Sequence, residues 1–372
     1  HIKALETAQS PAINIILPLG ISFFTFEFIH YIVDVYRGSK PVKSPLDFAL
    51  FASFFPSQIA GPIKRFQYFM HQLEEKPTLK AEYFNEGLFL ILQGFFKKIV
   101  LGDNIGLLVG QGFHNLQNLS LCDAWVTAIG FTFQIFFDFS GYTDIGRGSA
   151  LLLGYKVPEN FNLPFLAHNL TNFWHRWHIS LSTWLRDYLF IPLGGSRGSA
   201  WQTRRNTFLT MVLGGLWHGA DWTFVIWGIL HGAGLILSKE WTDFAARTSW
   251  LKPLRQTRVW HWCGVAFVCL FICQVSIFMR APNLDQALCL VGKFFGFGIN
   301  GITGDVSTAL LQSTVVYTLP VYLLYAWLHQ RSLTMAKNGV ALPSLARLAQ
   351  SCWQSSKALR LTTSAMLALF IS

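Results

Sequence analysis

Long apolar stretches constrain the fold of this chain more than any other feature. Stretches long enough to span a membrane, or nearly so, lie at 13–35, 86–110, 121–154, 206–238, 259–279 and 306–328. A transmembrane helix needs about 20 mostly apolar residues, because the hydrocarbon core of a bilayer is about 30 Å thick. Shorter apolar stretches at 47–60 and 179–193 predict re-entrant or interfacial helices. The sequence therefore predicts an all-α, polytopic membrane protein.

The composition supports the same class of protein. Only 13% of the 372 residues are charged and 52% are hydrophobic, whereas a soluble domain carries roughly 25% charged residues. The net charge of +10 comes from Lys and Arg residues that lie between apolar stretches and do not form one basic patch. This distribution argues against nucleic acid as a partner and makes membrane lipid the expected surroundings.

Glycine and proline interrupt several of the apolar stretches, at Pro18-Leu19-Gly20, Pro56, Gly61-Pro62 and Gly214-Gly215. Non-helical backbone at membrane depth is tolerated only where protein or a water-filled cavity surrounds it. The interruptions therefore predict broken helices around an internal cavity. Lys and Arg concentrate in cytoplasmic loops, so the basic segments 239–258 and 331–360 are expected on the cytoplasmic side and 281–305 on the other.

The densest polar segment is 169–189, which reads NLTNFWHRWHISLSTWLRDYL. Ionisable groups between membrane segments usually face a cavity or a partner and are functional candidates by default; an interfacial helix is the alternative and is compatible with this. The candidate residues for lining a substrate path here are Trp174, Arg176, Trp177 and Ser180. His175 and His178 have a spacing that can hold a metal on one helix face, but no third ligand is indicated, so no metal is expected.

His218 follows an apolar run that ends at Trp217, and it precedes Gly219 and Ala220. A neutral imidazole in this position can accept a proton from a substrate hydroxyl; the alternative is a core histidine satisfied by a backbone carbonyl. His231 repeats the local pattern 13 residues later. On one continuous helix that spacing is about 220° of rotation, which predicts that the two histidines do not act together.

Two further patterns complete the candidate residues. Asp138 and Ser140 lie in FQIFFDFSGYTDIGRG at 133–148, where Asp144 and Arg147 follow; these charges predict an internally paired network lining the cavity, with substrate contact as the alternative. The segment 194–198 matches G-x-S-x-G, the serine-hydrolase elbow. That motif has meaning only between a strand and a helix, so the match is interpreted as accidental.

Four segments in the same order carry a resemblance to a known family: PLGISFFTFEFIHYIVDVYRG at 18–38, FFPSQIAGPIKRFQYFMHQL at 54–73, NFWHRWHISLSTWLRDYLFIPLGG at 172–195 and GGLWHGADWTFVIWGILHG at 214–232. They resemble the membrane-bound O-acyltransferase superfamily, in its bacterial branch typified by the alginate O-acetyltransferase membrane subunit. The resemblance runs from about Pro18 to Arg280. It implies one integral-membrane acyltransferase domain over 1–372, built as a helical bundle around a transmembrane tunnel, with the earliest spans and the extreme C-terminus expected to be missing.

The resemblance also implies two catalytic histidines, His178 in the RWHIS segment and His218 in the WHG segment. His175 stands where the bacterial branch has arginine, so no catalytic role is carried over to it. The implied reaction takes an acyl group from a cytoplasmic thioester, with acetyl-CoA as the expected donor and no bound cofactor. His218 would act as general base, and His178 would position the acyl carbonyl or polarise it. The residues expected to bind substrate or line the tunnel are Trp174, Arg176, Trp177, Ser180, Asp138, Ser140 and Trp217.

The expected acceptor is an exported polysaccharide such as alginate, reached directly or through an extracytoplasmic partner protein, from a bacterial inner membrane. Peptidoglycan O-acetylation and teichoic acid D-alanylation remain open within the same family. A transporter or flippase is the alternative from another class, since broken helices and intramembrane charges also occur at transport sites. A passive assembly scaffold is the third possibility, and it predicts that neither histidine matters.

Overall fold

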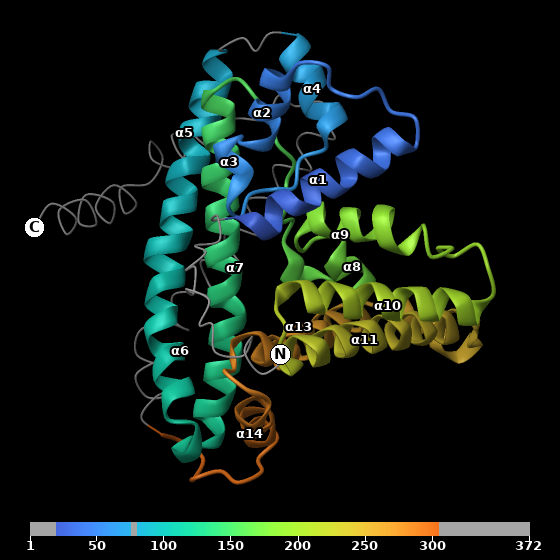
Figure 1. Cartoon of the computed structure of the whole chain (residues 1–372). Coiled ribbons are helices and arrows are strands. Elements are labelled where there is room, and N and C mark those ends of the chain that lie inside the picture. The colour runs from blue at the N-terminus through green and yellow to red at the C-terminus, as the bar shows by residue number, and fades with distance from the viewer. Residues whose placement is uncertain (1–19, 76–79, 305–372) are drawn as a thin grey trace, which may run out of the picture.

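A computed structural model describes residues 20–75 and 80–304, which form helices and no strand (Figure 1). The prediction of an all-α protein is confirmed over this part of the chain. The predicted span 306–328, the basic segment 331–360 and the first residues of the span 13–35 lie outside the described residues.

A long helical rod runs beside the longest helix of the chain (Figure 1). The rod joins α5 (Ala81–Phe95), the π-helix η1 (Phe96–Asp103) and α6 (Asn104–His114), and its neighbour is α7 (Leu121–Leu152). Glycines let the two backbones approach, since a Cβ on Gly94 would lie 2.5 Å from the Gly141 carbonyl oxygen. Small residues at helix contacts are typical of membrane proteins. The predicted stretches 86–110 and 121–154 are therefore both helical.

Four helices form the N-terminal part of the described chain: α1 (Ile21–Tyr36), α2 (Pro45–Ala52), α3 (Phe55–Gln58) and α4 (Phe66–Glu74). The predicted short helix at 47–60 is thus two helices, with Pro56 in the first turn of α3. A buried ion pair joins α1 to the segment before α4, with 2.6 Å between Glu27 Oε2 and Lys64 Nζ. This pair fixes α1 against the segment that precedes α4.

The polar segment forms short helices, and a long antiparallel hairpin follows it. The short helices are η3 (Pro164–Leu166), α8 (Leu170–Trp174), α9 (Ile179–Leu185) and η4 (Arg186–Phe190). The hairpin is α10 (Ala200–His218) and α11 (Trp222–Arg247) (Figure 1). Its helices cross closely, because a Cβ on Gly228 would lie 2.6 Å from the Met211 carbonyl oxygen.

The hairpin corrects the prediction of one continuous helix through 206–238. Gly219 adopts extended backbone with φ 171° and ψ 161°, which ends α10 directly after His218. Asp221 then caps α11, its Oδ1 accepting from the Thr223 amide at 2.9 Å. Asp is a strongly preferred N-cap residue, so Gly219 and Asp221 together turn the chain back.

The remaining described elements are η2 (Leu116–Asn118), which lies between α6 and α7, and η5 (Ser249–Leu251), α12 (Lys252–Arg255), α13 (Arg258–Arg280) and α14 (Leu284–Phe294), which follow the hairpin. α13 packs against both α7 and α11 and so joins the rod side to the hairpin. Within the described residues, α11 and α13 are long and apolar enough to cross a membrane. The predicted stretch 259–279 coincides with α13.

Candidate active site

His178 stands at the turn between α8 and α9, in a left-handed backbone conformation with φ 42° and ψ 56°. Such backbone is uncommon for residues other than glycine and occurs often at active sites. The side chain caps α9, because Nδ1 accepts a hydrogen bond from the Leu181 amide at 3.4 Å. An imidazole that accepts at Nδ1 carries its proton on Nε2. Nε2 is buried and has no partner within the described chain, so His178 presents an unused N–H donor.

His218 is the last residue of α10 and is half-buried among aromatic rings. Its ring centroid lies 4.6 Å from that of Trp217 and 4.9 Å from that of Trp227. Within the part of the chain that the structure describes, its imidazole forms no hydrogen bond. Among the described residues, His218 is therefore not a core histidine satisfied by a backbone carbonyl, and neither of its ring nitrogens has a hydrogen-bond partner there.

Aromatic rings connect the two histidines. Phe23 of α1 is stacked on His178 with 6.4 Å between centroids, and its ring meets Trp217 edge-on at 5.6 Å. Phe139 of α7 packs edge-on against His178 at 4.7 Å. Trp217 in turn contacts His218 at 4.6 Å, so a chain of rings joins His178 to His218. The fold thus brings together the RWHIS and WHG segments, 40 residues apart in sequence.

His231 also lies in this region. The prediction that the two histidines do not act together assumed one continuous helix, but the break after His218 places His231 on α11, which runs back beside α10. Trp227 lies between the two histidines, with centroid distances of 4.9 Å to His218 and 4.4 Å to His231. His231 is buried, and its Nδ1 has no partner among the described residues. The repeated HGA pattern was the sequence signal for it.

Three of the predicted path residues lie in α8 or just after it. Trp174 is buried with its ring 5.0 Å from His231, and its Nε1 has no described partner. Trp177 packs against Phe173 at 5.6 Å in the aromatic core. Arg176 donates to Asn172 Oδ1 at 3.0 Å and to the Asn162 carbonyl at 3.3 Å. Trp174 therefore lies against His231, while Trp177 and Arg176 contact the neighbouring parts of the fold.

Among the other predicted residues, some connect parts of the fold and one contacts a histidine. Ser180 Oγ accepts from the Ile63 amide at 2.9 Å, and the Ser180 amide donates to Asn160 Oδ1 at 3.1 Å, so Ser180 joins two segments. Asp138 forms an ion pair with Lys98 of η1 at 3.0 Å. Ser140 is buried, and its hydroxyl has no partner within the described chain. Trp217 contacts His218 directly. The predicted pairing of the α7 charges is thus observed at Asp138.

His175 and His178 do not share a helix face. His175 is exposed at the end of α8, whereas His178 is buried at the start of α9. The spacing argument for a metal at these two residues assumed a continuous helix, and the turn at His178 removes it. The described residues contain no group of three His, Cys, Asp or Glu side chains that could hold a metal ion.

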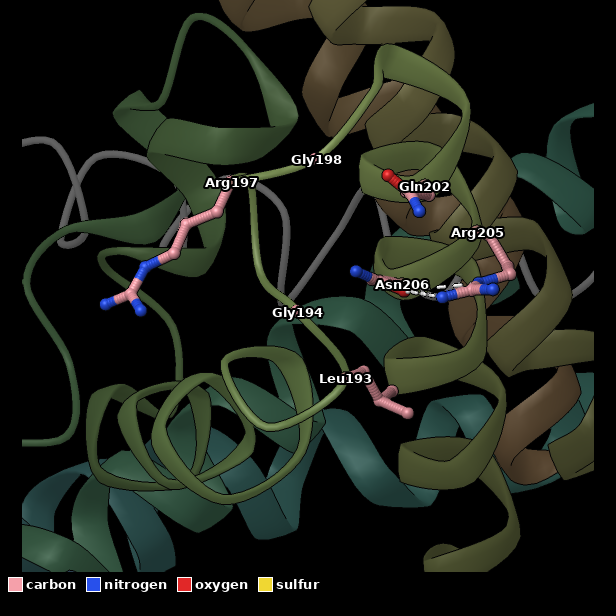
Figure 2. Close-up of a pocket in the computed structure, with 7 residues that line it drawn as sticks. All are labelled: Leu193, Gly194, Arg197, Gly198, Gln202, Arg205 and Asn206. Atoms are coloured by element: carbon pink, nitrogen blue, oxygen red, sulfur yellow. Dashed lines mark hydrogen bonds between the residues drawn. The ribbon is translucent and has the colours of Figure 1, made fainter.

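A separate pocket of about 330 Å³ lies beside the start of α10 (Figure 2), whereas His218 is the last residue of that helix. Its lining residues are Leu193, Gly194, Arg197, Gly198, Gln202, Arg205 and Asn206. Asn206 holds the pocket together, since its Nδ2 donates to the Gly195 carbonyl at 3.0 Å and its Oδ1 accepts from Arg205 at 3.0 Å. The G-x-S-x-G segment forms this loop after η4 and follows no strand, which confirms that the match is accidental.

Comparison with known proteins defines the class of this chain. The model of the membrane-bound O-acyltransferase family matches residues 39–280, and the chain belongs to this family. Both histidines fall inside the matched residues.

Individual relatives narrow the comparison. The chain is 44% identical over 308 residues to "Probable alginate O-acetylase AlgI" of Azotobacter vinelandii, covering 82% of this chain and 59% of that protein. It is 45% identical over 316 residues to the Pseudomonas aeruginosa protein of the same name, covering 84% and 58%. It is also 35% identical over 349 residues to the peptidoglycan O-acetyltransferase of Helicobacter pylori, covering 83% and 64%. The chain thus spans about three fifths of the length of these relatives.

Proposed function

We propose that this chain is an O-acyltransferase that moves an acyl group, with acetyl as the expected group, from a thioester to hydroxyls destined for an exported polysaccharide. The observation that carries the proposal is a pair of histidines joined through the rings of Phe23 and Trp217. Within the described residues, His218 has an unbonded imidazole and His178 has an unused Nε2–H donor. The names of the relatives at 44% and 45% identity favour alginate over the alternative polymers.

The chemistry assigns a different role to each histidine. His218 accepts the proton of the acceptor hydroxyl as its oxygen bonds to the thioester carbonyl carbon, a general-base step. His178 donates Nε2–H to the carbonyl oxygen, which becomes negative in the tetrahedral intermediate. The intermediate collapses by breaking the carbon–sulfur bond, and the proton on His218 passes to the departing thiolate. The aromatic surroundings exclude water, which limits hydrolysis of the thioester.

The arrangement of charge supports a multi-pass inner-membrane protein whose thioester donor arrives from the cytoplasmic side. Arg204 of α10 pairs with Glu240 of α11 at 2.8 Å, so the start of α10 lies at the same end of the hairpin as the basic segment 239–258, which begins in the last turns of α11. Arg197 and Arg205 lie at this end, and within the described chain neither has a carboxylate partner. These two arginines favour binding of an anionic thioester. The acceptor hydroxyl would then come from the polymer or from an extracytoplasmic partner protein.

The test supplies radiolabelled acetyl-CoA to membranes that contain the wild-type protein, the His218→Gln variant or the His175→Gln variant. His175 is the matched control because it is exposed and belongs to the same polar segment as His178. Label should reach polymer or a partner protein with wild type and His175→Gln, and fall by about 10²–10⁴-fold with His218→Gln.

Equal labelling by all three proteins would remove His218 from the chemistry. If wild type takes no label from acetyl-CoA, carrier-protein thioesters are supplied next, which tests the D-alanyl alternative. Failure with every thioester would contradict acyl transfer and favour the transporter.

A further inference from the structure

Trp217 carries a buried hydrogen-bond donor that the fold does not use. The indole Nε1–H can only donate, and in the described part of the chain that of Trp217 is buried without an acceptor. Two other tryptophans use their indole N–H: Trp184 donates to the Phe26 carbonyl at 3.1 Å and Trp125 to the Phe294 carbonyl at 2.8 Å. Buried polar groups are nearly always paired, so an unpaired one needs a cause.

The position of Trp217 suggests that cause. Its ring lies 4.6 Å from His218 and 5.6 Å from Phe23, the residue stacked on His178. Phe26 supports it from α1 at 4.9 Å. Trp217 therefore stands in the aromatic wall shared by the two histidines. Trp174 also has an unpaired Nε1, but its ring contacts Trp227 and His231 and no contact joins it to His178 or His218.

We propose that Trp217 Nε1–H donates a hydrogen bond to the carbonyl oxygen of the acyl thioester, as a second donor beside His178 Nε2–H. This inference rests on the proposed acyl transfer. The oxygen gains negative charge when the hydroxyl attacks and loses it when the carbon–sulfur bond breaks, so the donor is used most in the tetrahedral intermediate. A group that can only donate suits this task, since it takes no part in the proton transfer through His218. Fixed donors aimed at such an oxygen stabilise the transition state strongly.

The experiment compares Trp217→Phe with Trp184→Phe in membranes supplied with labelled thioester. The two tryptophans are matched, because both pack against Phe26, at 4.9 Å and 4.5 Å, and both substitutions remove the same indole volume. For Trp217→Phe, kcat should fall by about 10²–10³-fold, as when one oxyanion donor is removed, with KM for the thioester nearly unchanged. Trp184→Phe should keep kcat and lower the Tm in detergent, since the Phe26 carbonyl loses one of its two donors and keeps only that of His30.

Rates are normalised to the folded fraction from size-exclusion chromatography in detergent, so that poor folding is not counted as slow chemistry. A wild-type kcat in Trp217→Phe, or a fall in Tm as large as that of Trp184→Phe, would overturn the role of Trp217. Absence of transfer by wild type itself would instead contradict the proposed function. The two failures are thus distinguishable.

Discussion

Two regions of this molecule bury polar groups in opposite ways. Between α1 and α4, His30 uses both ring nitrogens: Nδ1 donates to the Phe26 carbonyl at 3.1 Å, and Nε2 accepts from the Phe66 amide at 3.2 Å. Beside it, Glu27 and Lys64 are paired. Between α9, α10 and α11, His178 Nε2 and Trp217 Nε1 have no described partner. Buried pairing indicates a structural role, and the unpaired groups of the second region support the proposal that a substrate binds there.

The largest expected effect is in the paired region, at Lys64→Met. This change leaves the Glu27 carboxylate buried without its cation, which costs about 3–5 kcal/mol. Thermal unfolding in detergent should show the loss as a lower Tm. The double variant Glu27→Leu/Lys64→Met is the control and should recover most of the stability, because replacing both partners by apolar groups is often neutral. A double variant as unstable as the single one would mean that the pair itself holds α1 in place.

The next effect is chemical, at His178→Asn. Asn tolerates left-handed backbone, and its side-chain oxygen can cap α9 as Nδ1 does now, while the Nε2–H is lost. Acyl transfer should fall by about 10²–10³-fold, the range for one oxyanion donor, with little change in Tm. His178→Leu is the contrasting variant. Leucine cannot cap α9 with its side chain, and it is strained in the left-handed backbone at φ 42°. Full activity in His178→Asn would assign His178 to the fold alone.

Periodicity and polar pattern were enough to predict the helical class, the helices at 86–110, 121–154 and 259–279, and the polar segment around His178. These features depend on local apolar content, which the sequence states directly. The break at Gly219 was missed because apolar residues continue on both sides of it. Extended backbone there and the Asp221 cap depend on the partner helix, which no local pattern reveals.

The candidate site divides for a similar reason. The two signature segments pointed to His178, His218 and Trp217, whose rings the fold connects through Phe23. The same argument chose Ser180 and Arg176, whose side chains hydrogen-bond to backbone groups of other segments. Phe23, Phe139 and Trp227 were not singled out, although their rings connect the histidines. Apolar side chains on membrane helices look alike in sequence. Only the crossing of α1, α7 and α11 shows which of them face the site.

A smaller effect on stability is expected at Asp144→Asn, which tests pairing between the rod and α7. Asp144 Oδ2 accepts from Lys97 at 2.6 Å and from Gln93 at 2.8 Å. Asn keeps an oxygen for one of these bonds but loses the charge, so the loss should be about 1–3 kcal/mol. Detergent unfolding measures it, and acyl transfer per folded molecule should be unchanged. Lost activity at normal stability would place Asp144 in the substrate path and break the comparison.

The smallest effect is expected at His231→Phe, which asks whether the unpaired region extends across Trp227. Phe keeps a ring against Trp174 and Trp227 and removes the unpaired Nδ1. The loss of acyl transfer should be about 3–10-fold, equivalent to one ordinary hydrogen bond of 0.5–1.5 kcal/mol, without a lower Tm. His30→Phe is the matched control, since both of its nitrogens are bonded and its loss should lower the Tm while sparing activity per folded molecule. If His231→Phe behaves like His30→Phe, the reactive region ends at Trp227, and only His178, His218 and Trp217 belong to it.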